Sequence, residues 1–441
     1  MKMVKWERKP LGAVADLCLG KMLDQNKNRG EPLPYLANVN VRWGEFALDD
    51  LRTMRFEPKE MDRYGLRFGD IVMCEGGEPG RCAIWKDQAP GMMIQKALHR
   101  IRPKEFLDCH FLFYSFLRIG QLKGFDQYVT GATIKHLPSE KLAKVEIEIP
   151  PLPIQQGIAG ILSAYDELIE NNQRRIRILE EMARSLYREW FVHFRYPGHD
   201  SPRPQAGEGL GVRAGFVDSP LGQIPQGWEV KKIAELLAKV SRQGKIKTQD
   251  YLQTGDLPVI DQGRELVGGY TNDADVEYSG ELPVIVFGDH TRILKFIDFP
   301  FACGADGTQL LRSNDERMPV SLFYYTLSVI ELSDFAYARH FKFLKEELVV
   351  VPIAEAATAF SERVNPIKRQ VRVLQQQSDN LRHTRDLLLP RLLSGQIALA
   401  TDTPPIYDED EFKRMVEKGT QAWAGVPDSA AWVETLRGNK E

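Results

Sequence analysis

Residues 155–191 read QQGIAGILSAYDELIENNQRRIRILEEMARSLYREWF, and this stretch decides the architecture expected of the chain. Apolar residues recur every seven positions, and a second series follows the first by four residues. This first seam comprises Ile158, Leu162, Tyr165, Ile169, Asn172, Ile176, Leu179 and Leu186. Such spacing predicts a coiled-coil helix, because the a and d positions of successive heptads fall on one narrow stripe.

A second seam lies near the end of the chain. It consists of Val364, Ile367, Val371, Leu374, Leu381 and Leu388 and is interrupted at Ser378 and Arg385. Pro366 is expected to begin a new helical segment, since proline is tolerated in a first helical turn and costly inside a helix. The alternative is that the two segments are amphipathic helices packed on separate cores.

The chain also repeats itself. The segment 6–11 (WERKPL) is echoed by 228–233 (WEVKKI), and 112–117 (LFYSFL) by 322–327 (LFYYTL). In each half a β-branched strand and a proline then precede the long helical segment. The offset between the halves shrinks from 222 to about 202, which indicates that the second half has lost roughly 20 residues. Two globular domains, each followed by a helix, are therefore expected.

The predicted fold is α+β, with two globular α/β domains separated by two long helices that form an antiparallel coiled coil, as a pseudo-two-fold tandem repeat. Residues 195–227 contain twelve prolines and glycines and are expected to be a linker without packed elements. The expected divisions are a first domain (1–153), a central helix (154–194), the linker (195–227), a second domain (228–352), a C-terminal helix (353–397) and an acidic tail of unknown role (398–441).

Charge and cysteines limit the function only loosely. The net charge is −3, but residues 401–441 hold nine acids and five bases, so the rest of the chain carries +1. A neutral body can bind DNA if its positive charge gathers on one side. The five cysteines form no CxxC pair, and no metal site is expected. Charges follow the N-terminal methionine, and no run is long enough for a membrane span, so a cytoplasmic protein is expected.

If the two helices pair, the layout is that of a spacer. A helix over 155–191 would be about 55 Å long at ~1.5 Å per residue. One turn of B-DNA is ~34–36 Å, so two domains held by such a rod could contact major grooves about a turn apart. Helix length would set the gap between two half-sites, and the domains would read the bases.

Three segments resemble a known family. Residues 151–156 (PLPIQQ) with the helix that leads into Trp190, residues 218–228 (DSPLGQIPQGW), and residues 381–395 (LRHTRDLLLPRLLSG) are similar to type I restriction-modification specificity subunits. The resemblance runs to about residue 400 and leaves the tail unassigned.

The resemblance implies that each globular half is a target recognition domain without a catalytic site. It implies double-stranded DNA as ligand, two modification (methyltransferase) subunits and two restriction (endonuclease and translocase) subunits as partners, and no membrane. No cofactor is expected in this chain. S-adenosylmethionine, ATP and Mg²⁺ would belong to the partners, which methylate adenine N6 and cleave DNA.

Other functions remain open. A specificity subunit of a related type II or phage-defence methyltransferase would have the same sequence features, and a coiled-coil adaptor that binds protein would keep the helices. No phosphate-binding loop of the GxxxxGK[ST] type and no methyltransferase cofactor loop is found, so a self-contained enzyme is not expected. A nuclease-like set drawn from Asp49 or Asp50 with Glu57 and Lys59 is a short pattern that arises by chance.

Candidate DNA-binding residues lie in glycine-rich turns and basic clusters. In the first domain they are Lys21, Arg29, Asn38, Asn40, Arg42, Trp43, Glu75, Glu78, Arg81, Lys96, His99, Arg100, Arg102, Thr133, Lys135 and His136. In the second they are Arg242, Lys245, Lys247, Asp289, His290, Thr291, Arg292, Asp306, Thr308, Arg339, His340 and Lys342. The alternatives are a tight hairpin with a local ion pair around Glu78 and Arg81, a solvated basic surface, and a structural turn at Asp289.

Overall fold

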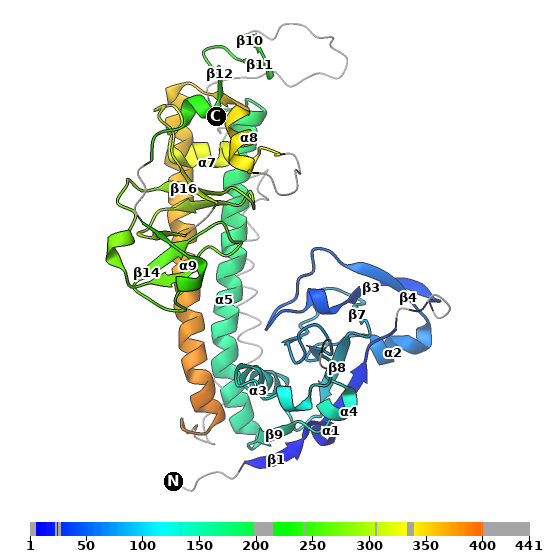
Figure 1. The fold of residues 1–441 in the computed structure, drawn as a ribbon. Helices are drawn as coiled ribbons and strands as arrows, with labels where there is room; N and C mark the ends of the chain where they lie inside the picture. The colour runs from blue at the N-terminus through cyan, green and yellow to red at the C-terminus, as the bar shows by residue number, and fades with distance from the viewer. Residues whose placement is uncertain are drawn as a thin grey trace, which may run out of the picture. The chain divides into compact units, whose positions relative to one another are not determined.

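The computed structural model describes residues 6–22, 24, 28–131, 133, 135–197, 215–240, 244–304, 307–332, 339–397 and 399. Arg242, Asp306 and most of the predicted tail lie outside the described residues. The chain divides into two compact units, of which unit 2 takes in Arg174–Gln375 and unit 1 takes in the described residues on either side. The two long helices, α5 (Leu152–Tyr187) and α9 (Ala354–Leu393), are each continuous and are each shared between the units (Figure 1).

Unit 1 contains a four-stranded antiparallel sheet, a three-stranded mixed sheet and a separate antiparallel pair of strands. Its strands are β1 (Glu7–Pro10), β2 (Ala15–Leu19), β3 (Glu31–Leu36), β4 (Arg52–Phe56), β5 (Ile71–Cys74), β6 (Cys82–Ile84), β7 (Met93–Ile94), β8 (Leu98–Pro103) and β9 (Glu146–Ile149). They form sheets in the orders β2-β8-β5-β6, β4-β3-β7 and β1-β9. The helices are α1 (Leu11–Val14), α2 (Met61–Tyr64), α3 (Cys109–Gln121) and α4 (Ser139–Leu142), with short 3-10 turns at Asn38–Asn40, Pro58–Glu60 and Asp126–Tyr128.

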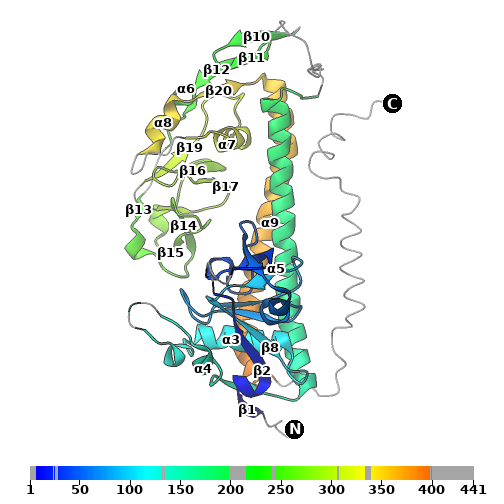
Figure 2. The ribbon, with the colours of Figure 1, turned by 90° about the vertical axis from the view of Figure 1, so that its right-hand side faces the viewer.

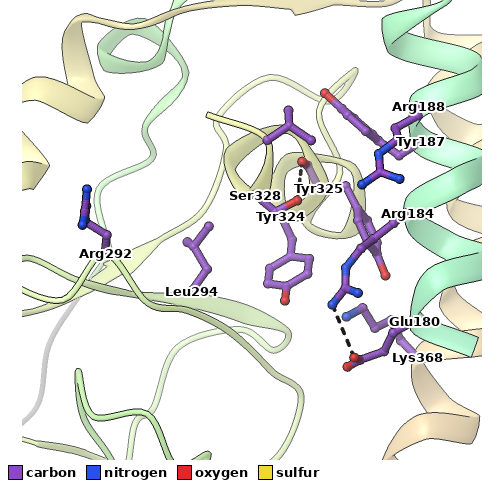
Figure 3. Close-up of a pocket in the computed structure, with 11 residues that line it drawn as sticks. Glu180, Arg184, Tyr187, Arg188, Arg292, Leu294, Tyr324, Tyr325, Ser328 and Lys368 are labelled. Atoms are coloured by element: carbon purple, nitrogen blue, oxygen red, sulfur yellow. Dashed lines mark hydrogen bonds and ion pairs between the residues drawn. The ribbon is translucent and has the colours of Figure 1, made fainter. Parts of the chain in front are cut away.

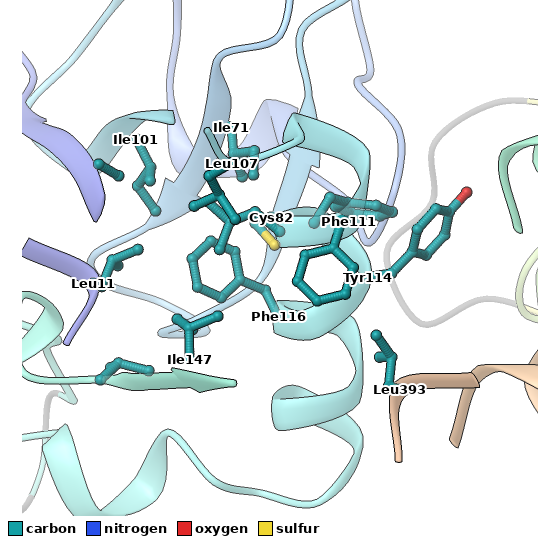
Figure 4. Packing of buried hydrophobic residues seen from close by; sticks show 14 of the residues in the cluster. Leu11, Ile71, Cys82, Ile101, Leu107, Phe111, Tyr114, Phe116, Ile147 and Leu393 are labelled. Atoms are coloured by element: carbon teal, nitrogen blue, oxygen red, sulfur yellow. The ribbon is translucent and has the colours of Figure 1, made fainter. Parts of the chain in front are cut away.

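The core of unit 1 joins the globular part to the long helices. Phe111 and Phe116 of α3 pack with Ile71 of β5 and Ile101 of β8 (Figure 4). The same cluster contains Ile154, Ile158, Ala159 and Leu162 from the start of α5 and Leu389, Leu392 and Leu393 from the end of α9. Asp108 begins α3 by accepting a hydrogen bond from the Phe111 N–H at 2.8 Å, as a helix N-cap does. The beginning of α5 therefore lies beside the end of α9 in this unit.

Unit 2 repeats this plan with fewer residues. Its strands are β10 (Phe216–Ser219), β11 (Gly222–Pro225), β12 (Glu229–Lys232), β13 (Lys245–Ile246), β14 (Leu257–Ile260), β15 (Gly269–Thr271), β16 (Val284–Gly288), β17 (Leu294–Ile297), β18 (Ala302–Gly304), β19 (Thr308–Leu311) and β20 (Leu348–Val351). The sheets are β13-β18-β14-β15, β17-β16-β19, β12-β20 and β10-β11. The helices are α6 (Ile233–Leu236), α7 (Val320–Ser328) and α8 (His340–Glu346), with 3-10 turns at Thr248–Asp250 and Ala274–Val276 (Figure 2).

The core of unit 2 is rich in aromatic rings. Phe360 of α9 is fully buried and its ring lies 5.1 Å from that of Phe191 and 6.0 Å from that of Tyr325 in α7. Ala183 and Leu186 of α5 belong to the same cluster, which also contains Val364, Ile367 and Val371 of α9. In this unit the end of α5 therefore lies beside the start of α9.

Corresponding elements recur at both ends of each globular part. β1 pairs antiparallel with β9, so that Glu7 faces Ile149, and β12 pairs with β20, so that Glu229 faces Val351. A one-turn helix follows the first strand of each pair, and a helix precedes the second. These are the places that the repeated sequence segments predicted.

Two expectations about element boundaries are wrong. Residues 216–225 of the predicted linker form the β10–β11 hairpin, because Phe216 and Ile224 bury their side chains and Gly222, at φ +91°, follows the turn. Pro366 does not begin a helix, since α9 passes through it. The flanking residues Val364 and Ile367 are buried in the core of unit 2.

The helix ends differ by a few residues from those expected. α5 begins at Leu152, and a π-helical turn (Arg188–Val192) extends it to Val192. α9 ends at Leu393, before Gly395, whose φ of +70° suits a helix terminus. The predicted seam residues in both helices are all buried or half-buried.

Candidate nucleic-acid interface

In unit 1 the structure brings three predicted segments together around Glu75, which directly follows β5. The Glu75 N–H donates to the carbonyl of Ala97, and the Glu75 carbonyl accepts from the N–H of Leu137, each at 2.8 Å. The Glu75 carboxylate lies 3.2 Å from Nδ1 of His136. Exposed polar side chains stand beside these anchors. We call this set the Glu75 cluster: Glu75, Lys96, Thr133, Lys135 and His136.

The turn between β5 and β6 is held by a local ion pair. Arg81 donates to Glu78 at 2.6 Å and to the carbonyl of Asn38 at 3.0 Å, and Trp43 Nε1 donates to Glu78 at 3.3 Å. The hairpin with a local ion pair, which the sequence left open, is thus the arrangement of the free protein. Glu78 remains more than half exposed, whereas Arg81 is largely covered.

In unit 2 a corresponding arrangement surrounds Asp289, which directly follows β16. The Asp289 N–H donates to the carbonyl of Gly307 at 2.7 Å, and the Asp289 carbonyl accepts from the His340 N–H at 2.8 Å. The carboxylate accepts from the Phe341 N–H at 2.8 Å and so fixes the start of α8. We call the surrounding set the Asp289 cluster: Asp289, His290, Thr291, Arg292, Arg339 and Lys342.

Gln262 ties the Asp289 cluster to the neighbouring strand, and sequence reasoning did not single it out. Its side-chain oxygen accepts from the His290 N–H at 3.1 Å, and its carbonyl accepts from the Thr291 hydroxyl at 2.7 Å. Gly307 has a φ of +74°, and a Cβ there would meet the Gln262 amide at 2.6 Å. Glycine at this position is therefore required both by the backbone and by the close approach.

Several predicted DNA contacts are instead buried within the units. Lys21 is 3% exposed, and its ammonium donates to Glu60 at 2.6 Å and to the Arg55 carbonyl at 2.9 Å. Arg100 donates to the carbonyls of Asp62 and Arg63. Both cations are buried and directed at acceptors inside the unit, so they leave the candidate set.

Other predicted residues have structural roles as well. Burial lowers the pKa of His99, which keeps the ring neutral while Nε2 lies 2.7 Å from the Leu137 carbonyl. Asn40 caps its own 3-10 turn, and Arg102 forms a two-pronged ion pair with Asp70 at 2.7 Å. The remaining buried members are Asp289, Thr308 and His340. The Asp289 carboxylate fixes the start of α8, and the side chains of Thr308 and His340 are too buried to reach a ligand on the surface.

The predicted residues that stay exposed or half-exposed are mostly cations and hydroxyls. In unit 1 they are Arg29, Asn38, Arg42, Trp43, Glu75, Glu78, Lys96, Thr133, Lys135 and His136. In unit 2 they are Lys245, Lys247, His290, Thr291, Arg292, Arg339 and Lys342. A rigid strand end that carries flexible cations is suited to contact a phosphate backbone.

Within the described part of the chain, one group of adjacent side chains has ligand atoms close enough to share a cation, at Asp108, Cys109 and His110. However, the Asp108 carboxylate is the N-cap of α3. Burial, followed by the charge of Asp108, raises the pKa of Cys109 to about 12, so this sulfur stays a thiol rather than the thiolate that metals prefer. The position of the Asp108 carboxylate is therefore explained by its role as the N-cap of α3.

The sequence of the first half matches a described family. Residues 3–181 fit the profile of the "Type I restriction modification DNA specificity domain". This match identifies a domain of the type I restriction specificity family within residues 3–181. The protein from Methanocaldococcus jannaschii named type I restriction enzyme MjaIX specificity subunit is 24% identical over 398 residues, which cover 83% of this chain and 87% of that protein. The MjaVIII specificity subunit of the same organism is 22% identical over 356 residues, 74% of this chain and 78% of that protein.

A solved structure of this specificity family has the same fold. The S subunit of a type I restriction-modification system from M. genitalium aligns with a TM-score of 0.54 at 17% identity, over 89% of this chain and 97% of that one. The resemblance predicted from the helix and domain-entry segments is thus confirmed. No helix among the described residues is long and apolar enough to cross a membrane.

Proposed function

We propose that this chain is the non-catalytic DNA-recognition subunit of a type I restriction-modification complex. Each unit would read one half of a bipartite, asymmetric DNA site, and the chain would act in the cytoplasm. The single observation that supports this most is the recurrence, in unit 2, of the elements that make up the specificity domain of unit 1. Two similar but unlike readers in one chain suit a site with two unlike halves.

The Glu75 and Asp289 clusters are the proposed DNA-facing surfaces. Each sits at the end of a buried strand, where the backbone is held by hydrogen bonds to two other segments. Exposed lysines and arginines beside these anchors would contact phosphates, and Thr133 or Thr291 would reach base edges. Lys135→Ala and Lys342→Ala should each reduce DNA affinity with little change in sequence preference, and each should lower the salt dependence by about one phosphate contact.

The two long helices are proposed to form an antiparallel coiled coil that sets the spacer and docks two modification subunits. Residues from both helices share a core in unit 1 and again in unit 2, with opposite ends of each helix involved. Removing one heptad from both helices would keep their register and shorten the rod by about 10 Å at ~1.5 Å per residue. At ~3.4 Å per base pair this should shorten the spacer by about three base pairs.

The decisive experiment is co-expression with the neighbouring modification subunit, followed by mapping of methylated adenines. The partner subunits would supply S-adenosylmethionine chemistry, and any restriction subunits would use ATP and Mg²⁺. A split motif with a fixed gap is expected for the native chain, and the matched double deletion should change only the gap. Deletion of a heptad from α5 alone should abolish methylation, because the two seams would no longer align. An unchanged gap after the double deletion would reject the spacer role.

A further inference from the structure

A cavity of about 320 Å³ lies within unit 2 and is lined mainly by charged and aromatic side chains. Figure 3 shows Arg184 and Arg188 extending into it from α5, Lys368 from α9, and Arg292 on the side away from α5. The lining contains one carboxylate, that of Glu180. Four cations and one carboxylate leave an excess of positive charge in a partly open cavity.

Most of the carboxylate charge nearby is already paired on the surface of α5. Glu180 lies 3.4 Å from Arg184, and Glu181 lies 3.6 Å from Arg184 and 3.3 Å from Arg188. A guanidinium has five N–H donors, so these contacts leave capacity on both arginines for a further acceptor.

Lys368 has no carboxylate in contact with its ammonium. Its Nζ lies over the rings of Tyr324 at 4.3 Å, Tyr325 at 5.1 Å and Phe296 at 5.2 Å, and no hydrogen bond links it to another described residue. Burial lowers the pKa of Lys368 to about 8, and Glu180 opposes this shift from a distance. The ammonium is therefore held in a site that lacks a full counter-charge.

Tyr325 supplies a second, independent sign of a missing partner. The side chain is 2% exposed and lines the cavity, yet its hydroxyl has no hydrogen-bond partner in the described part of the chain. A buried hydroxyl without a partner costs free energy, and such groups are rare in folded proteins. A ligand oxygen in the cavity would accept this hydrogen bond.

We propose that this cavity is a binding site for a phosphate group, held by Lys368, Arg184 and Arg188 and by a hydrogen bond from Tyr325. Cations that approach from two helices suit a tetrahedral anion with several oxygens, whereas a carboxylate is satisfied by a single guanidinium. The cavity exceeds the size of phosphate alone, so it also accommodates part of the molecule that bears the phosphate. That molecule is either a DNA strand, through its backbone, or a free phosphate compound.

The test uses the full chain and inorganic phosphate at constant ionic strength. Titration followed by ³¹P NMR line width and by melting temperature should show saturable binding and stabilisation. Lys368→Met, which keeps the stem but not the charge, should weaken phosphate binding by about tenfold or more, and Tyr325→Phe by about three- to tenfold. Lys239→Met, at an exposed position outside the cavity, should leave binding unchanged.

Two further measurements are needed: one checks that each variant folds, and the other distinguishes a DNA phosphate from a free phosphate compound. Melting without phosphate reports whether each variant folds, and Tyr325→Phe removes only an unpartnered hydroxyl. If a short DNA duplex releases bound phosphate, the natural occupant is a backbone phosphate. If both bind together, the occupant is a free phosphate compound, and DNA methylation by the assembled complex would be unaffected by Lys368→Met. Wild-type affinity in both variants, or no saturable binding to the native chain, would overturn the proposal.

Discussion

The junctions between the globular parts and the long helices are built with opposite charges in the two units. The β1–β9 and β12–β20 pairs define which residues of the two units correspond. Ile149 and Val351 occupy matching places in these pairs and are 202 positions apart. The same offset relates Asp166 of α5 to Lys368 of α9. An acid on the first helix thus corresponds to a base on the second.

In unit 1 the helix supplies carboxylates and the surroundings supply cations. Asp166 accepts a hydrogen bond from Tyr114 at 2.6 Å and forms an ion pair with Arg385 of α9. Glu170, one turn later, pairs with Lys86 of the globular part at 2.5 Å. Burial opposes the charge of Arg385, but Asp166 and Asp386 outweigh it, so the pKa of Arg385 is raised.

In unit 2 the signs are exchanged. Lys368 faces the ring of Tyr324 at 4.3 Å, and Tyr324 holds the place that Tyr114 has in the repeated segment of the first half. Arg372, which is 202 positions after Glu170, pairs with Asp298 of the globular part at 2.7 Å. Each globular part therefore matches the charge of its own helix, and its transfer to the other helix would oppose like charges. Such repulsion is an effective way to discriminate between similar partners.

The largest effect is expected from giving the first helix the residue of the second. Asp166→Lys would place an ammonium beside Arg385 and remove the acceptor of Tyr114. It should destabilise unit 1 by about 3–5 kcal/mol, as the loss of a buried ion-pair partner does. Urea unfolding with hydrogen exchange would locate the loss. Glu362→Lys, at an exposed site on α9, is the control, and the added change Arg385→Glu should restore much of the stability.

The hydroxyl groups of the tyrosines at the two junctions should contribute differently to the free energy of unfolding. Tyr114→Phe removes a hydrogen bond to a carboxylate and should cost about 1.5–3 kcal/mol. Tyr324→Phe keeps the ring beside Lys368 and should cost below about 1 kcal/mol. Equilibrium unfolding of both variants in the same buffer compares them, and equal losses would contradict the contrast between the junctions.

The junctions should also respond differently to pH. Burial, against the opposing charge of Glu180, sets the pKa of Lys368 at about 8, below its ordinary value of about 10.4. The folded state then binds fewer protons than the unfolded state between these values, so the free energy of unfolding should rise with pH across this window. The expected gain is about 1–2 kcal/mol, because Lys368 is only half-buried by surface area.

Lys368→Met isolates this contribution, since the difference between variant and native chain cancels the other titrating groups. The charged and titratable groups that face Lys368 are Glu180, Arg184, Asp298 and the two tyrosines of α7. Burial raises the pKa of both tyrosines, so they stay protonated in the window. Denaturation should give the variant a higher free energy of unfolding than the native chain at pH 7. This difference in free energy should become smaller at pH 10. A difference independent of pH would show that Lys368 keeps an ordinary pKa.

The smallest effect concerns the outer ion pairs. Arg372→Ala should cost about 1 kcal/mol, whereas Lys86→Ala should cost about 0.5 kcal/mol or less. The reason is that Arg372 also contacts the ring of Phe299 at 4.8 Å and the Asp298 carbonyl, whereas the carboxylate side of the Lys86 pair is half exposed. A double-mutant cycle on each pair measures the two coupling energies. A stronger coupling at Lys86 would reverse the ranking.

The sequence predicted the elements whose signal is local or periodic. The heptads of α5 and the repeated strand before each helix were found because their spacing is written within one segment. Ser378 and Arg385 were recognised as breaks in the second seam, yet their partners were not. Arg385 meets Asp166, 219 positions away, and spacing carries no information about such a pair.

The candidate site was predicted as a set of segments and not as a set of side chains. The turns at Glu75 and Asp289 do come together with the segments before β9 and β20. However, composition cannot separate a lysine that faces solvent from one that neutralises a buried acid, as Lys21 does with Glu60. The phosphate site was missed because its cations lie on two helices and a turn that are distant in sequence.

The β1–β9 and β12–β20 pairs have a consequence for how such chains can vary. In each unit the first and last strands of the globular part pair with each other. The chain therefore enters and leaves the globular part at one place, directly before a long helix. The inner paired residues are 136 positions apart in unit 1, Pro10 and Glu146, and 116 positions apart in unit 2, Lys232 and Leu348. The whole difference of 20 residues therefore lies between the paired strands, inside the globular part. A whole globular part can thus grow, shrink or be replaced without a change in the length of the long helices.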